Sequence, residues 1–424
     1  MPTIARALEM NAVMSFWIVN SFLLTSALTQ PLIMRLSYAF GGRMLLTLAI
    51  GICTLGSLIC AVAPGPVALL AGRCLGGCGS GALGVLTQLI LHKLATPRNR
   101  AKWESTISAL YWLGAALGPI LGGAAATEAS YNFIFWVNVP FGALALVILP
   151  FIVSLDDSSS WREVMGVDYL GWLLLWGSIA PILLAISWAM IFVLPLWFEP
   201  IVKLDPIISG ALLSACTLAM VLFAVVASII VCYISHIWLI LAGWTLVVAG
   251  MALLSATTTE TVVVIFVPIG LLAGAGFGIL YPALTVAVQC DATTDDETIH
   301  AVPLQSFFST IGQCFGIAVG SCVFLNQLES SLRRSDLTLD HAEEYARDAV
   351  SLANAIAQMP NSRNELQATL AASYGYGMRW VWISLCIIAG IALLLSLVFV
   401  KQGRRISQRR RSRRSLPEAF ELAA

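Results

Sequence analysis

Long apolar stretches separated by short polar ones set the pattern of this chain. Eleven stretches of about 20 to 30 residues are almost free of charged side chains. A helix needs about 20 apolar residues to cross a hydrocarbon core about 30 Å thick, and no water is present there to satisfy an open backbone. The pattern therefore predicts an all-α membrane bundle of about 11 transmembrane helices. These cover residues 11 to 34, 44 to 63, 66 to 92, 105 to 127, 131 to 155, 169 to 198, 206 to 231, 237 to 256, 261 to 289, 301 to 325 and 380 to 400.

Composition and charge placement support this prediction and orient the chain. Hydrophobic residues make up 59% of the sequence and charged residues 11%, whereas a soluble chain carries about 25% charged residues. Lys and Arg gather in alternate short loops, at Arg35 and Arg43, at 93 to 102, at Arg162 and at 401 to 414. The positive-inside rule places these loops in the cytoplasm. The N-terminus is then expected outside and the C-terminus inside.

The predicted organisation has four parts. A short segment at 1 to 10 precedes an N-terminal helical lobe at 11 to 198, which ends in a fused linker helix. A C-terminal lobe at 206 to 400 contains an external loop at 326 to 379, in which residues 340 to 359 have the spacing of a surface helix. A cytoplasmic tail at 401 to 424 begins with the polybasic run KQGRRISQRRRSRR. This run either attracts anionic lipid or only anchors the topology, and we expect no nucleic-acid partner.

Glycine placement indicates an internal duplication. Gly118 and Gly122 recur as Gly316 and Gly320 at a constant spacing of 198 residues. Two parallel halves related by an axis along the membrane normal leave such a signal. The two lobes are therefore predicted to be pseudo-repeats.

One ionised side chain lies well inside a predicted span. Arg73 occurs in the run AGRCLGGCGSGALG, and a charge at that depth is costly unless it faces a polar cavity or a partner. Snorkelling to the outer interface is the alternative reading. A second candidate is GAALGPILGG, which places Gly114, Gly118 and Gly122 on one helix face. Pro119 in its middle and Gly123 at its end predict a kinked, tightly packed helix that serves as a pivot.

These motifs resemble those of the major facilitator superfamily, most closely the fungal multidrug and toxin efflux transporters usually built with fourteen helices. The glycines and Pro119 of GAALGPILGG match its antiporter motif, and the Arg73 stretch is similar to a motif implicated in proton coupling. The run RLSYAFGGR, with Arg35, Gly41 and Arg43, looks like its cytoplasmic gating loop. The resemblance implies a secondary transporter that exports a drug, toxin or secondary metabolite by proton-coupled alternating access.

Three departures from the family pattern accompany the resemblance. The start of the chain looks like the end of the family's first helix, Tyr38 stands in place of an aspartate, and the chain passes from the family's seventh helix into its ninth between Trp188 and Ile191. No Asp or Glu lies well inside a predicted span, although proton coupling needs a titrating group. Either an edge carboxylate such as Glu104 serves, or coupling is lost, or the sequence is an incomplete version. A truncated, transport-inactive protein is therefore the alternative function.

The expected partners follow from the same reasoning. Polar side chains inside spans are candidates for a substrate cavity, although each can instead form an interhelical hydrogen bond; the main ones are Gln88, Tyr111, Trp112 and Gln305. The four histidines lack metal-ligand spacing, and no cluster of nucleophile and base is present. We therefore expect no cofactor, no metal and no enzyme activity. The expected partners are a small organic substrate, protons and lipids, for a monomer in the plasma membrane.

Overall fold

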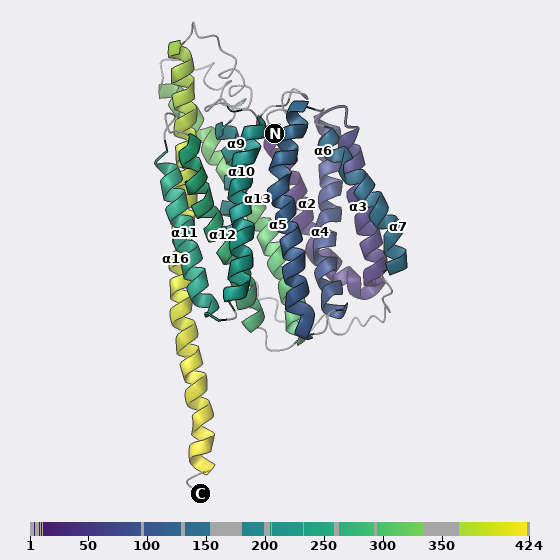
Figure 1. Cartoon of the computed structure of the whole chain (residues 1–424), viewed down its shortest axis with the longest axis vertical. Coiled ribbons are helices and arrows are strands. Elements are labelled where there is room, and N and C mark those ends of the chain that lie inside the picture. Colours follow the sequence, from purple (N-terminus) through teal and green to yellow (C-terminus); the bar gives the residue numbers. More distant parts are fainter. Residues whose placement is uncertain are drawn as a thin grey trace.

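The structure is a computed structural model. It describes residues 4, 8, 10, 12–94, 97–128, 132–152, 180–198, 204, 206–231, 233–257, 263–291, 295–334 and 364–421. The helices of this described part are α2 (Ala12–Phe40), α3 (Gly42–Ala61), α4 (Pro66–Leu94), α5 (Pro97–Glu128), α6 (Phe133–Trp136), α7 (Asn138–Ile152), α9 (Ala180–Phe198), α10 (Pro206–Ile230), α11 (His236–Ser255), α12 (Val263–Asp291), α13 (Asp295–Arg334) and α16 (Asn364–Glu421). They run side by side along one direction (Figure 1).

The all-α prediction is confirmed. Eight helices are long and apolar enough to cross a membrane, and shorter apolar helices lie at Leu113–Ala125, Phe133–Leu149 and Ala185–Pro195. Each of these eleven segments falls within or overlaps a predicted span. The predicted surface helix at 340 to 359 lies outside the described residues, as does the first part of the span predicted at 169 to 198.

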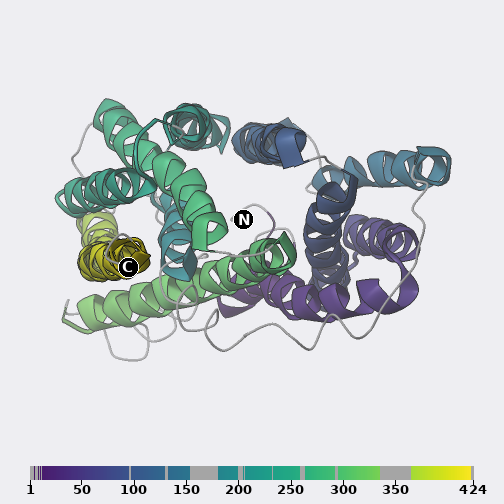
Figure 2. The same cartoon turned by 90° about the horizontal axis from the view of Figure 1, so that it is seen from below.

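The helices form two lobes with matching internal contacts. In the first lobe α4 packs against α2 and α3, and in the second α12 packs against α10 and α11. Two seams join the lobes, one between α5 and α10 and the other between α2 and α13, and Figure 2 shows both from below. A shift of 198 residues carries α4 onto α12 and α5 onto α13, so the two seams are equivalent under the repeat.

Helices α13 and α16 both extend into the predicted external loop. α13 continues to Arg334 instead of stopping at 325, and α16 starts at Asn364, before the predicted span at 380 to 400. Arg333 donates to Glu329 from Nε at 2.9 Å, an i, i+4 ion pair that stabilises this last part of α13. The external loop predicted at 326 to 379 is therefore shorter at both ends.

The predicted gating loop at 35 to 43 is mostly helix, which corrects the sequence-based expectation. α2 runs through Phe40 and α3 begins at Gly42, so a single residue, Gly41, joins them. Gly41 has φ 80° and ψ 152°, a conformation that is open to glycine and strained for other residues. One residue with this backbone joins the two helices where a loop was predicted.

Gly41→Ala is expected to lower the melting temperature of the solubilised protein. The added Cβ puts strain of about 1 to 3 kcal/mol into the junction. Differential scanning fluorimetry measures the shift. Gly51→Ala is the control, because Gly51 lies inside α3 and an added Cβ would meet no described atom within 4 Å. An equal melting temperature for the two variants would contradict the assignment of strain to Gly41.

The span predicted at 131 to 155 is divided into two helices. α6 ends at Trp136 and α7 begins at Asn138. Pro140 lacks the N–H that would bond the carbonyl of Trp136 four residues earlier, and this favours the break. The remaining apolar residues continue through α7 to Ile152.

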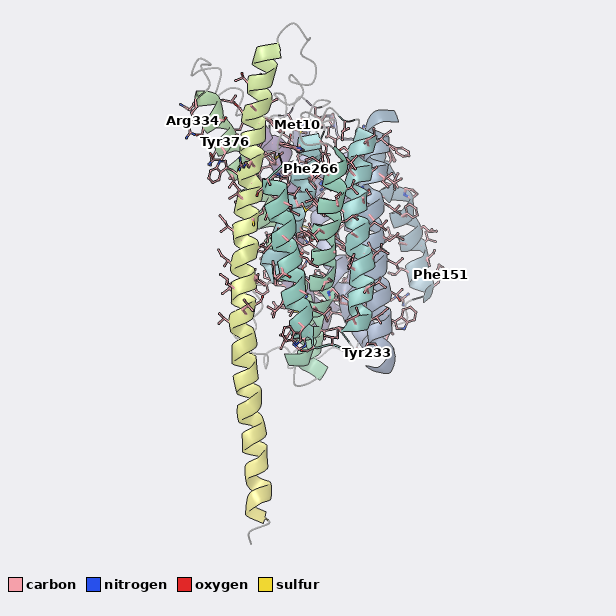
Figure 3. The ribbon with its side chains drawn as sticks, turned by 60° about the vertical axis from the view of Figure 1, so that its left-hand side comes forward. Met10, Phe151, Tyr233, Phe266, Arg334 and Tyr376 are labelled. Carbon is pink, nitrogen blue, oxygen red and sulfur yellow. The ribbon has the colours of Figure 1, made fainter. Side chains whose placement is uncertain are left out.

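Apolar side chains cover the outside of the bundle as well as its interior. Phe151 is 84% exposed and Tyr233 is 86% exposed, and Figure 3 shows both at the periphery of the bundle. An exterior this apolar is suited to lipid, since contiguous apolar patches of this extent are rare on soluble proteins. Below, the two ends of the bundle are named after Met10 and Tyr233, which Figure 3 labels at opposite ends.

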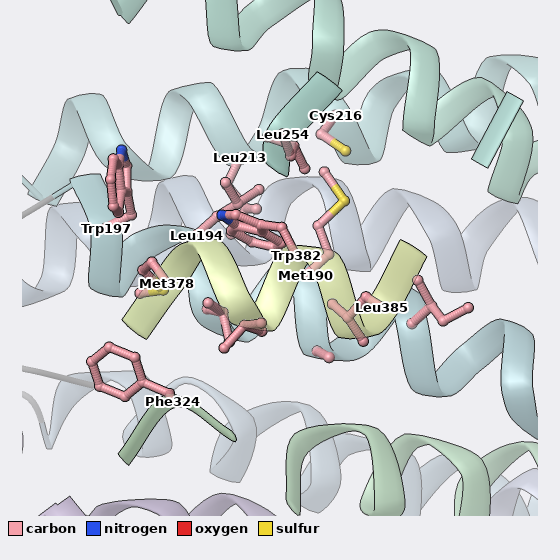
Figure 4. Packing of buried hydrophobic residues seen from close by; sticks show 14 of the residues in the cluster. Met190, Leu194, Trp197, Leu213, Cys216, Leu254, Phe324, Met378, Trp382 and Leu385 are labelled. Atoms are coloured by element: carbon pink, nitrogen blue, oxygen red, sulfur yellow. The ribbon is translucent and has the colours of Figure 1, made fainter. Parts of the chain in front are cut away.

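At the Met10 end the two lobes share one hydrophobic core. Phe16, Ile18 and Leu69 of the first lobe belong to the same buried cluster as Met190 and Trp382 of the second. Figure 4 shows Trp382 of α16 beside Met190 and Leu194 of α9, with Leu213 of α10 close by. Between helices in lipid, close contacts of this kind stabilise through van der Waals packing. The Met10 end is therefore where hydrophobic packing holds the lobes together.

Toward the Tyr233 end the described lobes have separate cores. The first lobe has clusters around Leu86 of α4 and around Met34 of α2. The second has a cluster of Ala227, Leu239 and Ala283. Neither set contains a residue from the other lobe, so hydrophobic burial at this end stabilises each lobe by itself.

Candidate functional site

Arg73 lies between α2 and α4, two turns from the Met10 end of α4. Its Nε donates to the carbonyl oxygen of Ile18 at 3.3 Å, and its guanidinium carbon lies 4.3 Å from the centroid of the Phe22 ring. A carbonyl dipole and an aromatic face both stabilise a cation, by about 2 kcal/mol for a desolvated cation–π contact. Neither partner is a carboxylate. The positive charge of Arg73 is therefore positioned without being neutralised by these contacts.

Close packing of α2 against α4 brings Arg73 to these partners. A Cβ added to Gly77 would overlap Thr25 Oγ1 and the carbonyl oxygen of Phe22, and one added to Gly81 would overlap the carbonyl oxygen of Ser26. Glycine at these positions lets the two backbones approach directly. The glycine run around Arg73 thus has a packing role, as its sequence indicated.

The predicted antiporter motif on α5 shows an unexpected asymmetry. A Cβ on Gly114, Gly118 or Gly122 would meet no described atom within 4 Å. On the repeat-related α13, a Cβ on Gly316 would overlap the carbonyl of Ala185 in α9, and one on Gly320 would lie 3.7 Å from Ala189 Cβ. The expectation of tight packing is therefore wrong for Gly114, Gly118 and Gly122. Their counterparts Gly316 and Gly320 are in contact with α9.

Pro119 contributes to the seam between the lobes. A Cβ on Gly210 of α10 would overlap the carbonyl oxygen of Pro119, so these two backbones touch near the Met10 end. Pro119 lies inside a helix that continues from Pro97 to Glu128. The motif thus places its proline, and not the three glycines named above, against the other lobe.

The predicted cavity residues are divided among three helices, α4, α5 and α13. Gln305 of α13 is 7% exposed and donates from Nε2 to Thr285 Oγ1 of α12 at 3.1 Å. Gln88 of α4 buries its Oε1 without a hydrogen-bond partner. Tyr111 of α5 is 54% exposed and lies near enough to Tyr281 of α12 to interact electrostatically. Gln88, Tyr111 and Gln305 all lie in the half of the bundle toward the Tyr233 end.

The side chains of Arg35, Trp112 and Glu104 lie outside the described part of the structure. Arg43 is the second residue of α3, and its carbonyl accepts from Thr47 Oγ1 at 3.0 Å. The gating and edge-carboxylate predictions for these residues therefore stay predictions.

One polar contact between the lobes was not predicted. Gln30 of α2 is 4% exposed and donates from Nε2 to Thr310 Oγ1 of α13 at 2.9 Å. The partners are 280 residues apart in sequence, and only the polarity of a glutamine inside a span hinted at such a bond. Sequence reasoning also missed the stacking of Phe22 on Arg73, because a phenylalanine in a span reads as lipid-facing or core.

Comparison with known proteins identifies the kind of molecule to which this arrangement belongs. The chain is 28% identical over 464 residues to MFS transporter L2 of a Phoma species, an alignment that covers 94% of this chain and 77% of the relative. It is 31% identical over 191 residues to Efflux pump FUS6 of Gibberella fujikuroi, which covers 44% of this chain and 34% of that relative.

Solved structures share the fold. A bacterial homologue of the human lysosomal transporter Spinster, in an inward-facing and unoccupied conformation, has a TM-score of 0.71 at 14% identity and covers 94% of this chain and 92% of that one. The nucleoside transporter NupG has a TM-score of 0.62 at 10% identity, with 94% and 93% covered. The sequence profile of the Major Facilitator Superfamily matches residues 1–321. The chain is accordingly a multi-pass integral membrane protein, a transporter rather than an enzyme, and belongs to the major facilitator superfamily.

Proposed function

We propose that this transporter exports a small organic molecule by alternating access driven by protons. One observation carries the proposal, namely that the lobes share a hydrophobic core at the Met10 end and have separate cores at the Tyr233 end. Lobes packed in this way can separate at the Tyr233 end without breaking the shared core. By the positive-inside rule the Tyr233 end is cytoplasmic. A substrate would then enter from the cytoplasm.

The polar groups toward the Tyr233 end favour an uncharged or amphipathic substrate. Gln88 and Gln305 provide carboxamides and Tyr111 a phenol, and these groups hydrogen-bond without demanding a counter-charge. Aromatic faces such as that of Tyr111 bury apolar substrate area. The names of fungal relatives, among them Efflux pump FUS6 and the MFS-type efflux pump MMF1 of Pseudozyma antarctica, support export over import. The proposed cargo is a drug, toxin or secondary metabolite, and the name of another relative, the Acurin A biosynthesis cluster MFS-type transporter of Aspergillus aculeatus, supports the last of these.

Arg73 is the residue proposed to couple transport to protons. A cation in a span repels protons from nearby acidic or substrate groups and attracts anionic ones. The glycine motif on α5, with Pro119 on the seam, is proposed as the pivot, and Arg35, Gly41 and Arg43 as the gate at the Tyr233 end. We further propose a monomer in the plasma membrane, whose basic tail at 401 to 414 attracts anionic lipid.

Expression in a yeast strain that lacks its own efflux pumps tests the proposal. Cells that carry the chain are expected to accumulate less of at least one amphipathic or aromatic compound than cells with empty vector, and collapse of the proton gradient is expected to abolish the difference. Equal accumulation over a broad panel, with folded protein present in the membrane, would instead favour the transport-inactive alternative.

A further inference from the structure

We propose that Gln30 and Thr310 are positioning residues that form a releasable clasp between the lobes at the Tyr233 end. The proposal rests on the lobe motion proposed above. It adds a specific pair of residues that sets how often the lobes part.

The clasp lies where hydrophobic contact between the lobes ends. Gln30 is one helical turn before Met34, whose cluster with Val85 and Leu89 belongs to the first lobe alone. Thr310 lies in α13, which packs against α2 across the seam. The Gln30–Thr310 hydrogen bond links the lobes across this seam, and Tyr111 of α5 lies close to Tyr281 of α12 across the gap between the lobes.

The hydrogen bonds determine which side chain of the clasp donates and which accepts. The Thr310 hydroxyl donates to the carbonyl of Ser306 at 2.9 Å, so its single proton is used within α13. It can therefore only accept from Gln30, which must present its NH2 group. The Gln30 carboxamide oxygen is then left buried without a partner.

A half-satisfied carboxamide makes a link that opens readily. A buried acceptor without a partner destabilises the closed arrangement, whereas in the separated arrangement water reaches both the oxygen and the NH2 group. An apolar contact of the same area would lose its burial on opening and gain nothing. The Gln30–Thr310 hydrogen bond therefore holds the two lobes in a defined position but only weakly, so that they can separate in each transport cycle.

Among the described residues, the same bonding pattern occurs again within the second lobe and provides a matched control. Gln305 donates to Thr285 Oγ1, the Thr285 hydroxyl donates to the carbonyl of Tyr281 at 3.0 Å, and the Gln305 oxygen is buried without a partner. Both helices of this second pair, α13 and α12, belong to the second lobe. A substitution that breaks the Gln305–Thr285 hydrogen bond removes the same kind of donor–acceptor pair but leaves the contacts between the two lobes in place.

Hydrogen–deuterium exchange of the full-length protein in lipid nanodiscs tests the clasp, with the α2 amides between 27 and 34 as the readout. Thr310→Val keeps the shape and removes the hydroxyl, and is expected to speed this exchange about 5- to 100-fold. Thr310→Ser keeps the hydroxyl and is therefore expected to exchange at the wild-type rate. The double variant Gln30→Leu/Thr310→Val replaces both partners by apolar groups and is expected to return the rate to wild type or below it. Thr285→Val is expected to leave the α2 rate unchanged.

Two results would overturn the clasp: an α2 rate in Thr310→Val equal to wild type, or an equal rise in Thr285→Val. The readout does not depend on cargo. Faster exchange in Thr310→Val together with no efflux of any compound would uphold the clasp and reject the export proposal.

Discussion

Gly316→Leu is expected to cost the protein much of its folded yield, whereas Gly118→Leu, its repeat-related counterpart on α5, is expected to leave the yield close to wild type. At Gly316 a Cβ would overlap the carbonyl oxygen, carbonyl carbon and Cα of Ala185. These are backbone atoms of α9 and cannot rotate away. Overpacking of this kind costs about 3 kcal/mol or more. At Gly118 the described structure has open space and the backbone is exposed.

Size-exclusion chromatography of fluorescently tagged, detergent-extracted protein measures the difference. The monodisperse peak of Gly316→Leu should shrink severalfold and its melting temperature should fall, with both quantities nearly unchanged in Gly118→Leu. Gly84→Leu is an additional control, because a Cβ at Gly84 on α4 would also meet no described atom within 4 Å. An equal loss of folded protein in Gly118→Leu and Gly316→Leu would mean that the glycine faces of α5 and α13 are both closely packed. It would contradict the difference in packing between the two lobes.

Arg73→Leu is expected to reduce proton-driven efflux by about tenfold or more, equivalent to about 1.4 kcal/mol. Leucine removes the charge, the hydrogen bond to the Ile18 carbonyl and the contact with Phe22. Arg73→Lys keeps the charge but not the planar group that reaches both partners, so an intermediate rate is expected. The measurement is the initial rate of efflux from cells or vesicles, once with an imposed pH gradient and once without it.

Phe22→Leu distinguishes a role of the Arg73 site in proton coupling from a role in packing. It removes the aromatic face and leaves the arginine, so it should weaken positioning without abolishing the response to the gradient. A residue with only a structural role would lower both gradient-driven and gradient-free rates in proportion to folded protein. If Arg73→Leu lowers both rates in proportion to the amount of folded protein, Arg73 has no role in proton coupling. The same conclusion follows if the variant transports at the wild-type rate.

Much of the fold follows from the hydrophobic pattern. Eleven stretches almost free of charge predict eleven apolar helices because lipid allows few alternatives to a helix, and the described segments agree. Helix ends were less well predicted. The chain from Arg35 to Phe40 carries polar residues that read as a loop, but α2 continues through it and one glycine makes the turn. Polar residues at a membrane surface are compatible with either state, so composition does not distinguish them.

The candidate site shows a second reason for such misses. Gly118 and Gly316 lie in matching glycine patterns, yet Gly316 meets α9 and Gly118 meets no described atom. Whether a glycine packs closely depends on which helix lies beside it, and the glycine motif does not specify that neighbouring helix. Gln30 and Thr310 likewise come together only because α2 and α13 form a seam. Contacts between the lobes therefore needed the structure, whereas the charge of Arg73 inside a predicted span was evident from the sequence.

The length of α16 has a mechanical consequence. The helix is continuous from Asn364 to Glu421, and Figure 1 shows its final part projecting well past the bundle. At 1.5 Å per residue, the part beyond Val398 is about 35 Å long. A tilt of the second lobe by about 10° would sweep the tip of such a rod through about 6 Å. The C-terminus therefore magnifies the rocking of the lobe to which it is attached, and a fluorophore placed there would turn each transport cycle into an optical signal.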